Sequence, residues 1–183
     1  GHFFVALQLM EAGVDLYSVA PRFCGEFQKG IDYIGDLSQF HRELKAHQEI
    51  ASHFGYKLSV HSGSDKFSVF PIMGEETKGR VHVKTAGTNW LEAVRVIIQA
   101  DPGLYRELHA FALEHLDEAK RYYHVTLDTG RIPDLRGLKD EDLGGLMDHS
   151  DARQLIHITY GLILQEKDES GAYRFRDRIY RCL

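Results

Sequence analysis

Short apolar runs alternate with longer amphipathic segments over the first hundred residues, and this alternation constrains the fold more than any other feature. Strands are predicted where β-branched and other apolar residues form short runs: 14–20, 56–61 and 80–85. Helices are predicted where apolar residues recur every three or four positions: 3–11, 38–54 and 89–99. Strands separated by helices favour βαβ units, whose strands are parallel. The sequence therefore predicts an α/β protein with a parallel sheet.

The remaining segments are less regular. Residues 21–35 are rich in glycine and aromatic residues and predict a long loop. Residues 64–79 predict an irregular excursion that is interrupted by Pro71. Apolar residues on one face predict a helix over residues 102–122, and the turn-rich residues 125–150 predict a loop with one short helix.

Residues 153–160 determine how many strands the sheet has. They fit either a strand or a helix, and we prefer a strand because β-branched residues alternate there with His157 and Thr159. About four strands result, whereas a closed (β/α)8 barrel needs about 250 residues. Half a barrel or a small doubly wound sheet fits this length. Residues 1–183 are therefore predicted to form a single α/β domain or a fragment of a larger (β/α)8 barrel.

The charge balance narrows the class of partner. The formal net charge is −5 at pH 7, whereas nucleic acids and anionic membranes favour basic surfaces. We therefore expect a small-molecule partner, no nucleic acid and no membrane. No apolar run approaches the roughly 20 residues that span a bilayer. Cys24 and Cys182 match no metal or redox spacing, so we expect free thiols in a reducing cytoplasm, with a long-range disulfide as the alternative.

Residues 61–67 gather reactive side chains directly after a predicted strand. The segment contains His61, Ser62, Ser64, Asp65 and Lys66. In α/β proteins ligands bind where the carboxyl ends of the strands meet. A turn alone would need only Ser-Gly-Ser, so the neighbouring imidazole, carboxylate and ammonium groups predict a chemical role. The two serine hydroxyls are candidate substrate ligands.

Three predicted strands each place one histidine on their more polar face. These are His61, His82 and His157. Neutral imidazole is the commonest nitrogen ligand of Zn, Ni, Co, Mn or Fe, and a catalytic site keeps one metal position open. The sequence predicts a divalent metal held by these histidines, with Glu26 or Asp65 as a carboxylate ligand. The alternative is that each histidine is a hydrogen-bonded core residue.

Two lysines and one arginine complete the candidate set. Lys66 and Lys84 are possible bases or electrophiles, because burial lowers the pKa of a lysine. Exposed surface lysines are the alternative. Arg22, just past a strand end, suits a substrate carboxylate, or else an internal salt bridge. Residues 85–90, including Asn89, place small residues at a helix start and can cradle an anion or a hydroxyl group.

Long blocks of this sequence resemble the tagaturonate–fructuronate epimerase family, which includes enzymes used as tagatose 4-epimerases. The blocks are residues 20–23, 25–27, 32–36, 57–68, 80–93 and 151–161. The resemblance implies a TIM-barrel-like fold and metal-dependent inversion at C4 of a ketose acid. Members of the family are considerably longer. The chain begins inside a helical pattern and closes without a helix stop signal, so we expect a later portion of a longer protein.

The residues and the resemblance together predict an isomerase. C4 lies two bonds from a C2 carbonyl, so exchange of an α-proton cannot invert it, whereas retro-aldol cleavage of C3–C4 and re-addition can. Asp65 or Lys66 would move the proton of the C4 hydroxyl, and Arg22 would hold the substrate carboxylate. The rival hypotheses are a metal-dependent sugar-acid aldolase and a non-catalytic sugar-binding or assembly module. The oligomeric state is not predicted.

Overall fold

The chain divides into two compact units. The computed structural model describes all residues from Gly1 to Leu183. Unit 1 comprises residues 1–28 and 32–86, and unit 2 comprises residues 29–31 and 87–183. Each unit has its own hydrophobic core. That residues 1–183 form a single domain stays a prediction.

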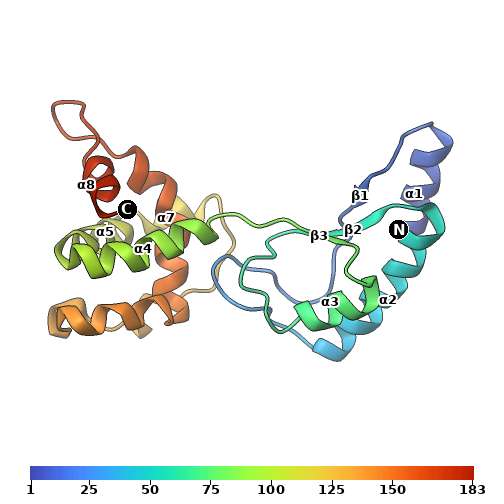
Figure 1. Cartoon of the computed structure of the whole chain (residues 1–183), viewed down its shortest axis with the longest axis horizontal. Helices are drawn as coiled ribbons and strands as arrows, with labels where there is room; N and C mark the ends of the chain where they lie inside the picture. Colours follow the sequence, from blue (N-terminus) through green and yellow to red (C-terminus); the bar gives the residue numbers. More distant parts are fainter. The chain divides into compact units, whose positions relative to one another are not determined.

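Unit 1 contains the sheet. Its three parallel strands lie in the order β1-β2-β3 and are β1 (Ser18–Val19), β2 (Lys57–Val60) and β3 (Val81–Val83). Its helices are α1 (His2–Glu11), α2 (Leu37–Phe54) and α3 (Phe70–Thr77). Helix α2 packs against β2, and α3 packs against β3 (Figure 1). The predicted α/β class with a parallel sheet is confirmed, although each strand is shorter than its apolar run.

The ends of α2 show how local sequence sets up the sheet. The Asp36 carboxylate accepts hydrogen bonds from the backbone N–H groups of Ser38 (2.7 Å) and Gln39 (3.0 Å), which caps the helix. Gly55 ends it in the left-handed conformation, with φ at 84°. One apolar stripe of the helix, including Leu44, is fully buried. Because the chain reverses at Gly55, β2 starts two residues later.

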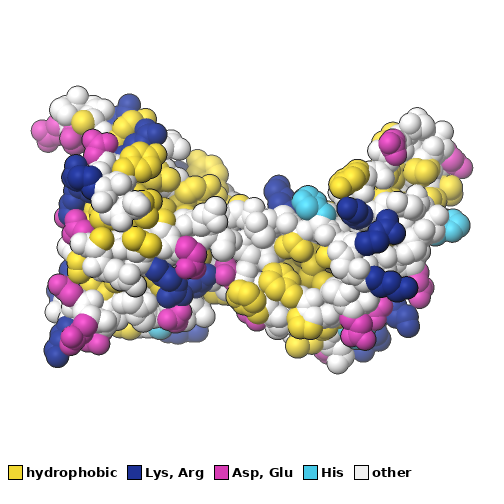
Figure 2. All heavy atoms as spheres, viewed as in Figure 1, with side chains coloured by type: hydrophobic (Ala, Val, Ile, Leu, Met, Phe, Trp, Pro, Cys, Tyr) yellow, Lys and Arg dark blue, Asp and Glu magenta, His cyan; other side chains and the backbone are white.

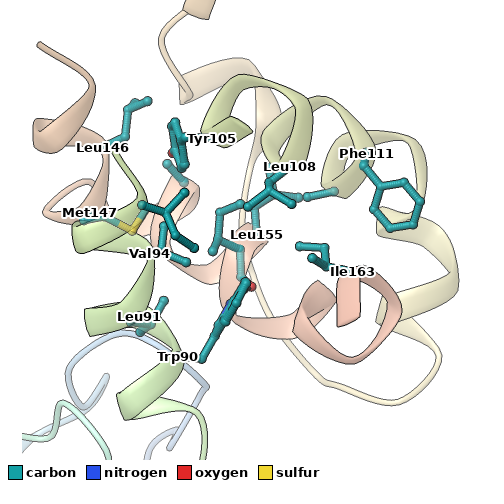
Figure 3. Packing of buried hydrophobic residues seen from close by; sticks show 14 of the residues in the cluster. Trp90, Leu91, Val94, Tyr105, Leu108, Phe111, Leu146, Met147, Leu155 and Ile163 are labelled. Carbon is teal, nitrogen blue, oxygen red and sulfur yellow. Dashed lines mark hydrogen bonds between the residues drawn. The ribbon is translucent and has the colours of Figure 1, made fainter. Parts of the chain in front are cut away.

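Unit 2 is a helical bundle without a strand. Its α-helices are α4 (Thr88–Ala100), α5 (Pro102–Glu114), α6 (Leu116–Lys120), α7 (Ser150–Gln165) and α8 (Arg176–Cys182). Its 3-10 helices are η1 (Thr129–Arg131), η2 (Leu135–Gly137) and η3 (Asp140–Met147). Figure 3 shows side chains from α4, α5, η3 and α7 converging on one core. The indole N–H of Trp90 donates to the carbonyl of Ile156 (2.9 Å), which links α4 to α7.

The predicted strand over residues 153–160 is wrong, because this segment lies in α7. The His149 side chain accepts a hydrogen bond from the Ala152 N–H and caps the helix start. Nearly every residue from 151 to 159 is buried. A helix that is buried on several sides lacks the polar face by which periodicity separates helix from strand. The sheet therefore has three strands.

Two irregular regions are more helical than the sequence indicated. Residues 64–79 contain α3, which Pro71 does not break, because proline in the first helical turn removes no internal hydrogen bond. Residues 125–150 contain three 3-10 helices and not one short helix. The helix predicted over residues 102–122 is divided at His115 into α5 and α6.

Surface character adds little to the fold. Basic and acidic side chains are interspersed on the visible face of each unit (Figure 2). Cys24 and Cys182 are free thiols. None of the helices combines the length and the apolar character that crossing a bilayer requires.

Candidate functional site

A hollow lies in unit 1 where β1 and β2 end. Its volume is about 330 Å³, and it is lined by the segment that follows β1, by Val60 at the end of β2 and by His61. Two of the predicted site residues, Arg22 and His61, line this hollow, and both side chains are exposed. The carboxyl ends of parallel strands are where α/β proteins bind ligands. The structure thus brings a guanidinium and an imidazole group together at the expected edge of the sheet.

His82 lies on β3, and His61 directly follows the neighbouring strand β2. Ser59 of β2 is paired with His82 of β3, and its hydroxyl lies 3.1 Å from the Nδ1 atom of His82. The ladder continues beyond β2, since the N–H of Lys84 donates to the carbonyl of Val60 (2.9 Å). His61 directly follows Val60. The contact at Nδ1 leaves Nε2 of the exposed His82 as the nitrogen available to a ligand.

The segment after β2 is bent against β3. Ser62 and Asp65 have positive φ values of 53° and 62°. Such conformations cost on the order of 1–3 kcal/mol each and persist only where the surroundings hold them, which is typical of functional loops. A Cβ atom on Gly63 would overlap the Val83 side chain, so glycine is needed for this close approach. The buried Ser64 hydroxyl accepts from the N–H of Ala86 at 3.3 Å.

Lys66 ties the two loops of this edge together. Its side chain is fully buried, and its ammonium group donates to the carbonyls of Gln28 (2.7 Å) and Ser64 (2.9 Å). The alternative of an exposed lysine is therefore wrong. Gln28 belongs to the loop after β1 and Ser64 to the loop after β2. These contacts favour an anchoring role over a free base.

Asp32 makes a second tie that the sequence did not reveal. Its carboxylate accepts from the backbone N–H of Ser68 (3.1 and 3.2 Å) and from the Ser68 hydroxyl (2.9 Å). The loop after β1 is thereby fixed to the start of α3. An aspartate in a glycine-rich loop carries no local sign of a partner 36 residues away.

The other predicted site residues of unit 1 surround this edge. Lys84 is exposed just after β3, and Asp65 is half-buried. Glu26 is exposed, pairs through its backbone with Ile34, and accepts a hydrogen bond from the Gln28 side chain. These positions are compatible with roles at the hollow, and those roles stay predictions.

His157 and Asn89 belong to unit 2. Asn89 is exposed in the first turn of α4. His157 is only 2% exposed, and its ring packs so closely that a Cβ atom on Gly87 would overlap Nε2. Because His157 lies on a helix, the strand-face argument that grouped it with His61 and His82 is wrong.

The sequence profile of tagaturonate epimerase matches residues 1–183. The chain belongs to the tagaturonate epimerase family. It is 49% identical over all 183 residues to the tagaturonate/fructuronate epimerase of Thermotoga maritima. It is 60% identical, with a TM-score of 0.97, to the native and to a glycerol-complexed crystal structure of fructuronate-tagaturonate epimerase from Cohnella laeviribosi.

The chain spans 37% of the length of these relatives, while they match 100% of it. The resemblance predicted from the sequence blocks is confirmed at the level of the family. No group of three or more His, Cys, Asp or Glu side chains in the 183 residues is arranged to hold a metal ion. His61 and His82 suit a metal as imidazole donors but do not make a complete site by themselves.

Proposed function

We propose that this chain is part of an epimerase that interconverts tagaturonate and fructuronate by inverting C4 of the ketohexuronate. The observation that carries the proposal is the match of one epimerase family along the whole chain, at 49–60% identity. Identity at this level, together with a TM-score of 0.97, supports a shared fold and a shared site. The partner is therefore a small sugar acid.

The hollow at the ends of β1 and β2 is the proposed position of the substrate. The exposed Arg22 guanidinium would bind the hexuronate carboxylate through two parallel N–H···O hydrogen bonds. Ser62 would contact a substrate hydroxyl, whereas the buried Ser64 hydroxyl is already engaged by the backbone of Ala86. Lys66 and Asp32 would fix the two loops that line this edge.

The proposed chemistry is cleavage and reformation of the C3–C4 bond. A base removes the proton of the C4 hydroxyl, and C3–C4 breaks to give an aldehyde and an enediolate. The aldehyde turns, the enediolate adds to its other face, and the protonated base returns the proton to the new C4 oxygen. Asp65 is the preferred base, because its carboxylate lies in the strained segment after β2. Lys84 is the second candidate, whereas two carbonyl oxygens already engage the ammonium group of Lys66.

A divalent metal is part of this proposal. When bound, it would polarise the ketose carbonyl and stabilise negative charge on oxygen. His61 and His82 would be two of its ligands. Glu26 remains a proposed ligand, and others would come from the portion that the longer relatives have in addition. In the order β1-α2-β2-α3-β3, strands and helices alternate as they do in a (β/α)8 barrel. We propose that the longer protein completes such a barrel.

The experiment is metal analysis and hexuronate turnover of the full-length protein and its variants. His61→Ala and His82→Ala should each lose most of the bound metal and at least 100-fold in turnover, because ligands are lost. His53→Ala, an exposed residue of α2, is the matched control and should keep both.

If a chelator left hexuronate turnover unchanged, the metal would have no place in the proposal. Unchanged metal content with lower stability in both variants would favour the non-catalytic module. Accumulation of free three-carbon products would favour the aldolase.

A further inference from the structure

The loop after β1 forms most of the wall of the hollow in unit 1. Apart from Val60 and His61, every residue that lines the hollow lies within residues 20–27. Cys24 is in the middle of this loop but does not line the hollow. The contacts of Cys24 are instead with α2 and Tyr33, behind the wall. Because Arg22 is only two residues away, groups that fix Cys24 also restrict the position of Arg22.

Glu43 of α2 holds the backbone N–H of Cys24. Its Oε2 atom accepts that hydrogen bond at 2.7 Å, and its Oε1 atom accepts from the Gln39 side chain at 2.9 Å. The hydrogen bond from Gln39 and then that from Cys24 lower the pKa of Glu43, so its carboxylate is ionised at pH 7. Hydrogen bonds to an ionised acceptor are shorter and stronger than bonds between neutral groups. The carboxylate is therefore a firm anchor for the loop.

Tyr33 holds the carbonyl group of the same residue. Its hydroxyl donates to the Cys24 carbonyl at 3.1 Å and lies 3.4 Å from the Cys24 Sγ atom. Burial raises the pKa of Tyr33, so the hydroxyl keeps the proton that it donates. The Tyr33 ring packs against Phe27 and Phe40, with centroids 5.1 and 5.4 Å away. A Cβ atom on Gly25 would overlap this ring, so the loop passes directly over it.

One face of α2 supports the loop from behind. The Phe23 side chain is buried, and its ring centroid lies 5.2 Å from that of Phe40 and 5.5 Å from that of His47. Phe40, Glu43 and His47 recur at spacings of three and four residues, which places them on the same side of the helix. Apolar packing thus fixes Phe23, and hydrogen bonds fix the next residue.

From these contacts we infer that Glu43 and Tyr33 are positioning residues of the epimerase, which hold the peptide groups on both sides of Cys24 and so place the Arg22 guanidinium at the hollow. The inference rests on the proposed function, in which Arg22 binds the hexuronate carboxylate. Neither Glu43 nor Tyr33 lines the hollow, so both act through Arg22. A guanidinium that makes two parallel hydrogen bonds to a carboxylate tolerates little displacement.

The test is hexuronate turnover by the full-length enzyme, with KM and kcat measured separately. Glu43→Ala and Tyr33→Phe should each raise KM about fivefold or more and leave kcat within about threefold, because the carboxylate contact is the same in the ground state and the transition state. Glu43→Gln keeps an acceptor for the Cys24 N–H and should stay within about twofold of the wild-type KM. The matched control is Glu49→Ala, which removes an exposed carboxylate from the same helix and should also leave KM unchanged.

Arg22→Ala shows whether the effect passes through Arg22. This change should raise KM, and adding Glu43→Ala or Tyr33→Phe should then raise it by no more than about a further twofold. The inference is overturned if Glu43→Ala and Tyr33→Phe leave KM unchanged, if they raise it equally with and without Arg22, or if Glu49→Ala raises it as much. A fall in kcat alone also overturns it, since a partly unfolded enzyme behaves in this way. If Arg22→Ala itself leaves KM unchanged, the proposed carboxylate site is wrong and the inference falls with it.

Discussion

Lys66 is a fully buried ammonium group whose two carbonyl partners come from different loops. In Lys66→Met the side chain stays apolar and long, but the carbonyls of Gln28 and Ser64 lose their donor. We expect unit 1 to lose about 2–4 kcal/mol of stability, since each unsatisfied buried group costs about 1–3 kcal/mol. Amide hydrogen exchange of β2 measures this loss. The exposed Lys84→Met should stay within about 0.5 kcal/mol of the wild type.

The same pair of variants separates anchoring from catalysis. If Lys66→Met kept full amide protection and abolished turnover in the full-length enzyme, Lys66 would act on the substrate directly. Loss of protection together with turnover supports the anchoring role. The sequence pattern placed Lys66 at the carboxyl edge of the sheet. Its burial, however, depends on the loop that contains Gln28, nearly 40 residues earlier in the chain.

His109 should make the stability of unit 2 depend on pH. Burial lowers its pKa from 6.5 to about 4 in the folded chain. Between these values the unfolded chain binds a proton that the folded chain does not, so stability falls as the pH falls. From pH 7 to pH 4.5 we expect a loss of about 2–3 kcal/mol from this group. Urea unfolding followed by Trp90 fluorescence measures the loss, and His109→Phe should lack that part of it.

At the scale of elements, local signals predicted the helices whose ends are set by their own sequence. Helix α2 was predictable because Asp36 and Gly55 cap it and one stripe is apolar. Helix α7 was not, because its burial on several sides removes the polar face. Helix α3 was not predicted, because Pro71 was taken to interrupt the segment. Proline is compatible with the first turn of a helix but not with its interior.

The start of α4 depends on a glycine for two separate reasons. Gly87 has φ of 80°, and a Cβ atom there would overlap the His157 ring. Gly87→Ala should therefore cost unit 2 about 2–4 kcal/mol, from backbone strain plus overpacking. Gly171 in the same unit has φ of 84° with no atom within 4 Å of an added Cβ. Gly171→Ala should then cost only about 1 kcal/mol.

A double variant isolates the contact with the imidazole. Adding His157→Ala to Gly87→Ala should cost less than the sum of the two single changes, because the overlap disappears. Denaturation followed by Trp90 fluorescence measures all four chains. Strict additivity would mean that the His157 ring does not restrict this position.

At the scale of the whole molecule, the sequence placed Arg22 and His61 correctly just past strand ends, whereas it grouped His157 with His61 and His82 wrongly. Arg22 and His61 line one hollow because strand direction alone sends both to the carboxyl edge. His157 was assigned to that set through a strand that does not exist. Segment 29–31 was equally unpredictable, since it joins unit 2 through hydrogen bonds from Arg153 to the carbonyl of Gly30 and from Gln154 to that of Lys29.

Two separate cores should respond separately to mutation. Leu44 is fully buried in the core of unit 1, and Leu155 is fully buried in that of unit 2. Each leucine-to-alanine change should cost about 2–5 kcal/mol. Trp90 lies in the core of unit 2, so Leu155→Ala should lower the midpoint of its fluorescence transition. Leu44→Ala should leave that midpoint within about 0.5 kcal/mol of the wild type and should weaken amide protection in β2. A Trp90 transition that shifted equally in both variants would mean that the two cores unfold as one cooperative unit.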